Sequence, residues 1–390
     1  MDMGEGIVKK PSLLRLFLEF LKLGATGFGG LAIIAYIQRD ICEKRKWLDP
    51  ETFAHGLALA QVIPGSPTTQ VSAYVGLKLR GIPGALLSFV AYNLPAFMLM
   101  LGLTYLYERV HDLPKAVSIF AGLQVVIMAI ILHAVWTFAR SFLKTPRQFS
   151  IAAVALVWSV LKIHPMIVII FSALLGLFWY RGQPFQAAES RQSKPSYGYK
   201  TILILLLVLA GWFAAFFFFD RKMFELAFAM FRVDLFAFGG GYAAIPLMFH
   251  EVVTRYHWLD AKTLMSGVAL GQVTPGPVII TATFIGYLFQ GLAGALVATI
   301  SIYAPSLLIL IAAVPYFDRL QNNPYFNRAI GGVLCAFVGL LAWLAYSFGA
   351  KVPWDPAGVI LAAAALLALL LKVETVWVVL AGIIVSFLWS

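Results

Sequence analysis

Apolar segments separated by short polar connections follow one another along the whole chain of 390 residues. Apolar stretches of about 18 or more residues recur throughout, and each is long enough to cross a bilayer as a helix. We therefore expect an all-α polytopic membrane protein with about 13 membrane segments. The segments are predicted near residues 12–37, 51–79, 82–107, 115–139, 148–161, 164–180, 201–219, 222–248, 262–289, 292–317, 325–349, 358–371 and 374–389.

The pattern and its interruptions occur twice, at an offset of about 210 residues. Phe-Gly-Gly stands at 28–30 and again at 238–240, and Gln-Val-x-Pro-Gly stands at 61–65 and again at 272–276. An internal duplication in a membrane chain, with glycine and proline breaks at matching positions, is typical of a secondary transporter. The substrate site is therefore predicted where the broken segments of the two halves meet.

The apolar segment at 201–219 has no counterpart in the first half of the chain. Each half contains an even number of predicted segments, so this extra crossing would start the second half on the opposite side of the membrane. We therefore expect two inverted-topology repeats with broken or re-entrant helices. The predicted units are an N-terminal transporter repeat at 1–181, a polar linker with the unpaired helix at 182–219, and a C-terminal transporter repeat at 220–390.

Loop charge favours this orientation, because Lys and Arg are more frequent in the loops that an intracellular N-terminus would place inside. The exception is the basic cluster at 39–46, which simple alternation places outside. The cluster would lie inside if the first two segments of each half were re-entrant hairpins, which enter the membrane and return to the same side. The sequence leaves both arrangements open.

The composition narrows the class of protein. Charged residues make up only 12% of the chain, against about 25% in soluble domains, so no soluble domain is expected. The net charge of +11 is explained by Lys and Arg in cytoplasmic loops and does not indicate a nucleic-acid partner. Cys42 and Cys335 have no metal-ligand neighbours at a useful spacing, so we expect no metal, cofactor or disulfide framework. The lipid bilayer is the expected environment, and no cleavable signal peptide is expected.

The break between residues 61 and 70 carries the residue types that an anion site needs. Pro64 and Pro67 remove backbone donors, and Gly65 permits the chain to reverse. The helix that restarts there has N–H groups without intrahelical partners, and such a terminus can bind an anion. We expect nearby polar side chains to add hydrogen bonds: Ser66, Thr68, Thr69 and Gln70 in the first half, and Gln272 and Thr274 in the second half.

Glycines form the other pair of breaks, Gly29-Gly30 in the first half and Gly239-Gly240-Gly241 in the second. A glycine pair in a membrane helix often reflects only close helix packing, and a Pro-Gly pair often reflects only a kink. Irregular backbone at membrane depth is tolerated where it lines a cavity or is buried in protein. Because both breaks of the first half recur in the second, which makes four paired breaks, we favour one central polar cavity.

Lys22 and Arg232 occupy matching positions in the two halves. Arg15, Glu19 and Lys22 share one helix face, which favours an amphipathic helix at the membrane interface. The alternative is that Lys22 and Arg232 attract an anion. An intramembrane enzyme would need paired carboxylates, an activated nucleophile or metal ligands, and Asp234 is the one acid near the motifs, without a partner. We therefore expect a protein that is not an enzyme.

The duplicated motifs resemble the chromate ion transporter family, in its long-chain, two-domain type. The compound motif is Phe-Gly-Gly, Trp-Leu-Asp, Gln-Val-x-Pro-Gly and Gly-x4-Gly-x2-Gly, and both copies are present. The resemblance implies a multi-pass protein of the prokaryotic plasma membrane that exports chromate and confers chromate resistance. It also implies that the motif residues belong to the substrate-binding region: Phe28, Gly29, Gly30, Gln61, Pro64 and Gly65, with Gly239, Gly240, Gln272, Pro275, Gly276 and Pro277.

The two copies of the motif differ at Ser66-Pro67, which corresponds to Pro277-Val278, so the halves are not equivalent. Chromate and sulfate are both tetrahedral dianions of similar size. The residues therefore do not separate a chromate exporter from a transporter of sulfate or another oxyanion. Uniport, proton coupling and an antiporter that exchanges sulfate stay open, as does assembly into a homodimer.

Overall fold

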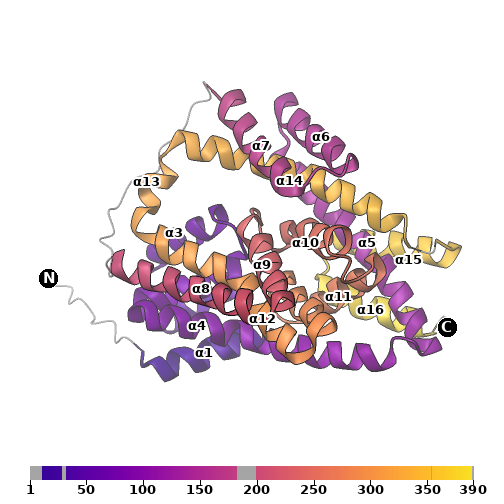
Figure 1. The fold of residues 1–390 in the computed structure, drawn as a ribbon, viewed down its shortest axis with the longest axis horizontal. Helices are drawn as coiled ribbons and strands as arrows, with labels where there is room; N and C mark the ends of the chain where they lie inside the picture. The colour runs from indigo at the N-terminus through magenta and orange to yellow at the C-terminus, as the bar shows by residue number, and fades with distance from the viewer. Residues whose placement is uncertain (1–10, 29–31, 182–198, 353, 389–390) are drawn as a thin grey trace.

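The computed structural model describes residues 11–28, 32–181, 199–352 and 354–388. All regular structure in these residues is helical (Figure 1), as the sequence predicts. The first half contains α1 (Leu13–Ala25), α2 (Ala32–Gln38), α3 (Pro50–Val62), α4 (Pro67–Val110), α5 (Pro114–Phe142), α6 (Pro146–Val160) and α7 (Pro165–Trp179). After α8 (Tyr199–Phe219), the second half contains α9 (Arg221–Leu235), α10 (Gly241–Phe249), α11 (Ala261–Val273), α12 (Thr281–Ala313), α13 (Phe317–Gln321), α14 (Pro324–Gly349), α15 (Pro356–Leu370) and α16 (Thr375–Leu388).

Five helical stretches among the described residues are long and apolar enough to cross a membrane. They are Pro67–Val110, Pro114–Phe142, Ile202–Phe219, Val278–Tyr316 and Pro324–Gly349. The helices α7, α15 and α16 are apolar but shorter. The predicted apolar segments therefore coincide with helices, and the chain is a multi-pass membrane protein.

The breaks predicted from glycine and proline interrupt helices in both halves. In the first half α1 ends at Ala25, and α4 begins at Pro67 after α3 has ended at Val62. Proline is tolerated at the first position of a helix, because its missing N–H would have no intrahelical partner there. In the second half α10 begins at Gly241, and the chain restarts after Pro277 with a short 3₁₀ turn, η3 (Val278–Ile280).

The helices before and after the second break of each half run antiparallel. His55 of α3 lies against Tyr74 of α4, with 3.3 Å between Nδ1 and the tyrosine hydroxyl. Residues 19 apart in one straight helix would be about 28 Å apart, so the chain reverses between them. In the second half Gly267 of α11 packs against the ring of Phe284 of α12 in the same way. Each pair forms a helical hairpin that turns at the Pro-Gly motif.

The first break of each half also lies in a hairpin. After α2 and α10 the chain continues into π-helical turns, η1 (Arg39–Lys44) and η2 (His250–Arg255). Arg45 bonds back to Glu19 on α1, and Glu251 accepts a 2.7 Å hydrogen bond from Arg232 on α9. These ion pairs join the segments before and after the first break of each half.

The two halves share unusual backbone angles at matching positions. A positive φ is uncommon for residues other than glycine. It occurs in four pairs separated by the repeat offset: Lys46 and His257 (both 53°), Gly65 and Gly276 (105° and 108°), Gly81 and Gly291 (65° and 60°), and Lys162 and Lys372 (60° and 66°). Two different sequences would not place these turns alike by chance, so the halves fold alike locally.

The helices α4 and α12 each fold back on themselves at a glycine, Gly81 and Gly291. The arms on either side of Gly81 touch through their backbones, because a Cβ added to Gly76 would strike the carbonyl oxygen of Gly84. The predicted segments 51–79 and 82–107 are therefore joined by a tight turn within α4 rather than by a loop.

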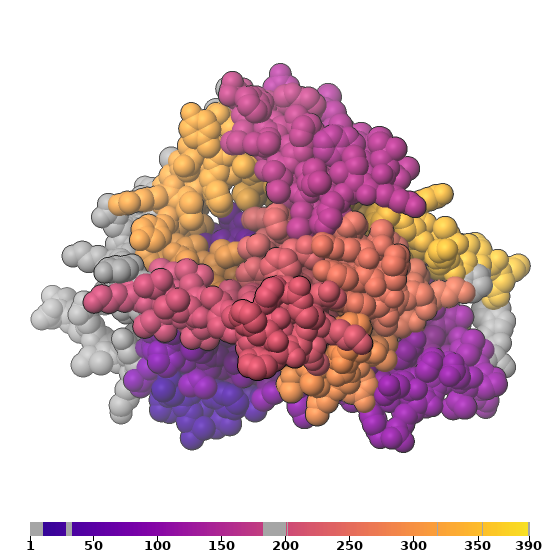
Figure 2. Space-filling view, viewed as in Figure 1, coloured from indigo at the N-terminus to yellow at the C-terminus, as the bar shows by residue number. Residues whose placement is uncertain are grey.

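The two halves are interleaved rather than side by side. The α15–α16 pair packs against α5 of the first half, and the α6–α7 pair packs against α14 of the second half (Figure 1). The long helices α4 and α12 also pack against each other. The unpaired helix α8 crosses the face of the molecule seen in Figure 2 and packs mainly against α9. Each repeat therefore covers part of the other.

Candidate functional site

The breaks of the two halves are hydrogen-bonded to each other. The N–H of Gly65, in the Pro-Gly turn of the first half, donates to the carbonyl of Ala237, at 3.0 Å. The matching N–H of Gly276 donates to the carbonyl of Gly27, at 2.9 Å. Each Pro-Gly turn thus contacts the segment that leads into the Phe-Gly-Gly motif of the other half. A Cβ added to Gly241 would lie 3.5 Å from the backbone nitrogen of Val278, so the described parts of the four predicted breaks lie together.

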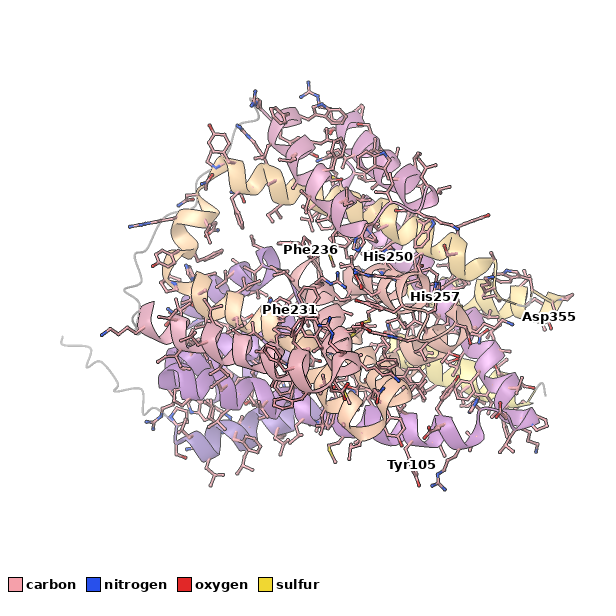
Figure 3. The ribbon with its side chains drawn as sticks, viewed as in Figure 1. Tyr105, Phe231, Phe236, His250, His257 and Asp355 are labelled. Atoms are coloured by element: carbon pink, nitrogen blue, oxygen red, sulfur yellow. The ribbon has the colours of Figure 1, made fainter. Side chains whose placement is uncertain are left out.

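The starts of two helices converge at this place. Gly240 directly precedes α10, and a Cβ added to it would lie 3.7 Å from Cδ of Pro67, the first residue of α4. The first turn of a helix carries free N–H groups and the positive end of the helix dipole. Phe236, in the loop before this glycine motif, lies near the middle of the molecule (Figure 3). The arrangement therefore favours a negatively charged ligand.

The polar side chains after Gly65 are buried and mostly form the turn itself. Thr69 donates from its hydroxyl to the carbonyl of Ser66, at 2.9 Å, and the side-chain amide of Gln70 donates to the carbonyl of Pro64. The hydroxyls of Ser66 and Thr68 are 3.0 Å apart, and only one of them can donate to the other. One hydroxyl proton of that pair is left for a ligand, whereas Thr69 and Gln70 have roles in the turn.

The corresponding turn of the second half is less polar. Its positions matching Thr68 and Thr69 are Ile279 and Ile280, in the η3 turn. Thr274 donates to the carbonyl of Gly271, at 2.8 Å, and Gln272 accepts a bond from the hydroxyl of Tyr242, at 3.3 Å. The two halves therefore differ in sequence from Ser66-Pro67, which matches Pro277-Val278, through the first turn of the following helix. The first half supplies the more polar turn.

The Phe-Gly-Gly motifs are only partly described. Gly29 and Gly30 lie outside the described residues, while Phe28 is 38% exposed. In the second half Gly239 has a φ of 94° and packs closely against Phe138 and Leu334. The adjacent Gly240 has a φ of 97°, and Gly241 begins α10. Gly239 and Gly240 therefore adopt conformations that other residues rarely adopt.

Lys22 and Arg232 differ in their surroundings. Lys22 is exposed on the last turn of α1. Arg232 is instead paired with the buried Glu251, which also lies 3.7 Å from both Arg255 and His164. The charge of Arg232 is therefore largely compensated within the protein.

The face that Arg15, Glu19 and Lys22 were expected to share at the membrane interface is not uniformly exposed. Glu19 is only 8% exposed and pairs with Arg45. The expectation of a simple interfacial helix is wrong for this residue, because α1 packs closely along α4. Gly24 permits that packing, since a Cβ there would strike the backbone of Tyr92.

A buried acid lies beside the breaks. Asp234, near the end of α9, is fully buried and accepts a 2.9 Å hydrogen bond from the N–H of Ser306 on α12. The sequence shows Asp234 as an isolated acid but gives no sign of Ser306. The residue of the first half that matches Asp234 is Gly24. This mismatch, which shows that the acid belongs to one repeat only, is the single signal in the sequence that sets Asp234 apart.

A cavity of about 370 Å³ lies elsewhere, between α5, α15 and α16, and is lined by Gly122, Trp354 and Ser386 among others. Asp355, another lining residue, lies at the edge of the molecule (Figure 3). None of the lining residues belongs to the four breaks. The exposed side chains near the breaks include Gln61, at the end of α3, and Phe28.

Paired broken helices whose breaks meet near the centre of a multi-pass helical protein define the class of secondary transporters built from repeats. The family model described as "Chromate transporter" matches residues 14–177 and again residues 224–387. The chain therefore belongs to the chromate transporter family, in its long-chain type with two copies of the domain.

Several relatives match most of the chain. An uncharacterized transporter of Methanocaldococcus jannaschii is 40% identical over 97% of this chain and 94% of its own length. A chromate transport protein of Cupriavidus metallidurans is 31% identical, over 85% of this chain and 81% of the relative. A probable chromate transport protein of Synechococcus elongatus is 29% identical, over 85% and 83%. No solved structure matches the chain.

Proposed function

We propose that this protein exports chromate from the cytoplasm and thereby confers chromate resistance. The observation that carries the proposal is the reciprocal pair of hydrogen bonds, Gly65 to Ala237 and Gly276 to Gly27, which joins each Pro-Gly turn to the segment before the Phe-Gly-Gly motif of the other half. The relatives of Cupriavidus metallidurans and Synechococcus elongatus, whose names refer to chromate transport, support the choice of anion.

A tetrahedral oxyanion suits the groups at the breaks. The first turns of α4 and α10 present backbone N–H groups, and Ser66 and Thr68 offer one free hydroxyl proton between them. Hydrogen bonds from neutral donors can bind a dianion without a buried cation, as helix N-termini do elsewhere. The site we propose comprises these groups with Gly65, Gly240 and the exposed Gln61.

The interior-negative membrane potential supplies a driving force for export. Moving one charge across 100 mV is worth about 2.3 kcal/mol, so a dianion moving outward gains roughly twice that amount. An alternating-access carrier could use this energy alone. The potential therefore favours the proposed direction, which is export from the prokaryotic cytoplasm across the plasma membrane.

We further propose that the hairpins at the breaks are re-entrant and that the repeats are inverted. If each hairpin returns to the side it came from, the basic cluster at 39–46 lies in the cytoplasm, in agreement with the excess of Lys and Arg on that side. The single helix α8 then starts the second repeat on the opposite side. Each repeat keeps an even number of crossings.

Cysteine labelling tests this topology. Glu51 and Lys262 are exposed at matching positions near the starts of α3 and α11. A Glu51→Cys variant should react with an impermeant maleimide only from the cytoplasmic side, and a Lys262→Cys variant only from the outer side. The native Cys42 and Cys335 are buried and give a low background. Labelling of both variants from one side would exclude inverted repeats.

Chromate accumulation in cells tests the function. Cells that make the protein should accumulate less chromate than cells that lack it, and a Gly240→Leu variant that still inserts into the membrane should behave like the empty control. Counterflow of labelled chromate in proteoliposomes, with sulfate as competitor, then shows whether the two anions share the site. Unchanged or higher accumulation in cells would refute export.

A further inference from the structure

Asp234 is a fully buried carboxylate, and it forms no ion pair with the residues that the structure describes. Its Oδ2 accepts the N–H of Ser306, at 2.9 Å, directly after Pro305 in α12. Its Oδ1 has no hydrogen-bond partner among the described residues. Ser306 donates its own hydroxyl to the carbonyl of Tyr303, at 3.2 Å. Within the described part of the chain, one carboxylate oxygen is therefore left without a donor.

The described groups that interact with Asp234 do not include a cation. Tyr303 of α12 interacts electrostatically with Asp234 and with Tyr92 of α4, and neither tyrosine hydroxyl has a hydrogen-bond partner in the described structure. On α9 itself the charged residue nearest to Asp234 in sequence is Arg232, which is paired with Glu251. Among the described residues no Lys, Arg or His forms an ion pair with Asp234. Burying an unpaired carboxylate is expensive, so the neutral acid is the favoured form.

The carboxyl group lies directly against the proposed anion site. A Cβ added to Gly65 would stand 3.1 Å from Oδ1 of Asp234 and would strike Cβ of Ser306. The N–H of the same glycine bonds to Ala237, three residues after Asp234. A dianion bound at the Pro-Gly turn would therefore lie close to this oxygen.

The first repeat has no equivalent of this pair. The positions that match Asp234 and Ser306 are Gly24 and Ala96. A Cβ added to Gly276, the counterpart of Gly65, would meet only Cβ of Ala96, at 3.5 Å. The acid therefore occurs in the second repeat only. It lies beside the Pro-Gly turn of the first repeat, where the other turn has Ala96 instead.

We propose that Asp234 binds the proton that accompanies the oxyanion, one proton for each anion carried, which makes the transporter a proton–oxyanion symporter. This inference rests on the proposed function. An ionised Asp234 would repel a dianion in the adjacent turn, whereas the protonated acid is neutral and offers an O–H donor from Oδ1. Binding is reciprocal, so the anion also favours the proton. The proton is taken up where the anion binds and is released on the side where the anion leaves.

Symport changes the energetics of the cycle. A dianion that moves with one proton carries a net charge of −1, so the membrane potential still favours export but with half the driving force. An acidic exterior would oppose export. Transport should therefore depend on both the potential and the pH gradient, whereas uniport would depend on the potential alone.

A purely structural role for Asp234 is the competing explanation, since its Oδ2 satisfies the backbone N–H of Ser306. The Asp234→Asn variant separates the two explanations. An asparagine keeps an oxygen for the Ser306 N–H but cannot release a proton. Asp112, whose side chain is 91% exposed between α4 and α5, provides the matched control variant Asp112→Asn.

The experiment measures proton and chromate movement together in proteoliposomes of the full chain. The potential is clamped with potassium and valinomycin, an internal dye reports pH, and labelled chromate is followed at about pH 8, where the dianion predominates. Wild type and Asp112→Asn should move about one proton per chromate, in the same direction as chromate. Above the pH at which half of the Asp234 side chains are protonated, wild-type flux should fall about tenfold per pH unit.

In Asp234→Asn the proton-to-chromate ratio should fall to near zero, and the remaining flux should lose its dependence on pH. Chromate flux without proton movement in wild type, flux that requires sodium instead, or an unchanged ratio in Asp234→Asn would overturn the symport while leaving chromate transport in place. Absence of chromate counterflow in the wild type would instead overturn the proposed function. If Asp234→Asn fails to fold, the wild-type ratio still decides between symport and uniport, and the fall of wild-type flux with pH tests whether one titrating group controls it.

Discussion

Replacing Gly65 with alanine perturbs the point where the two repeats are joined. The φ of Gly65 is 105°, and an L-residue in left-handed backbone costs roughly 1–2 kcal/mol. The added Cβ would also strike Cβ of Ser306, and overpacking of this kind costs about 1–3 kcal/mol. If the turn moves to relieve the contact, the hydrogen bond to Ala237 is lost, at about 1 kcal/mol.

These costs amount to a few kcal/mol at the site where the anion is proposed to bind. A loss of about 2.7 kcal/mol corresponds to roughly a hundredfold change in an equilibrium constant. We therefore expect Gly65→Ala to slow labelled chromate counterflow by one to two orders of magnitude. Thermal unfolding of the purified variant, measured in parallel, shows how much of the cost also destabilises the fold.

Two glycines serve as controls for this variant. Gly81 has a φ of 65° but no atom within 4 Å of an added Cβ, so Gly81→Ala tests backbone strain alone, away from the breaks. Gly102 lies inside a helix with open space around it, so Gly102→Ala tests the substitution without strain or contact. Wild-type counterflow in Gly65→Ala, or an equal loss in Gly81→Ala, would refute the idea that the joined turns form the site.

Three further outcomes follow from the geometry. Gly276→Ala should reduce counterflow less than Gly65→Ala, because the added Cβ meets Ala96 at an ordinary 3.5 Å; a larger loss would contradict the assignment of the more important turn to the first repeat. Arg232→Gln should lower the free energy of unfolding by about 3–5 kcal/mol, because it leaves Glu251 buried without its main partner. Lys22→Gln, at the matching exposed position, should leave the melting temperature unchanged. Chromate affinity measured on Lys22→Gln also shows whether that lysine attracts the anion. The double variant Ser66→Ala with Thr68→Val should raise the KM for chromate about tenfold with little effect on thermal stability, and an unchanged KM would remove these hydroxyls from the site.

The helices and their breaks could be predicted from the sequence because both depend on local chemistry. Length and apolar composition determine which segments form membrane helices, so the predicted segments lie within a few residues of the observed ones. Proline and glycine act on the backbone of their own segment, so the breaks near Pro64 and Gly239 were also predictable. The duplication then indicated that the breaks would be related to one another.

Interactions between distant segments could not be predicted in this way. Nothing near residue 19 indicates that Glu19 is buried against Arg45, and nothing near residue 70 indicates that the Gln70 amide bonds within its own turn rather than to a ligand. Side chains that look alike in the sequence, such as Lys22 and Arg232, differ because only one of them meets a buried acid. Burial and partner choice depend on which helices pack together.

The sequence by itself determined that this is a duplicated, all-helical membrane protein with four paired breaks, because hydrophobic periodicity, proline and glycine act over a few residues. Only the tertiary structure decided that each Pro-Gly turn bonds to the opposite repeat and that the terminal helix pairs pack across the halves. It also placed Asp234 of α9 against Gly65 of the first repeat. These contacts join residues more than 140 positions apart, and only the packing of whole helices brings them together.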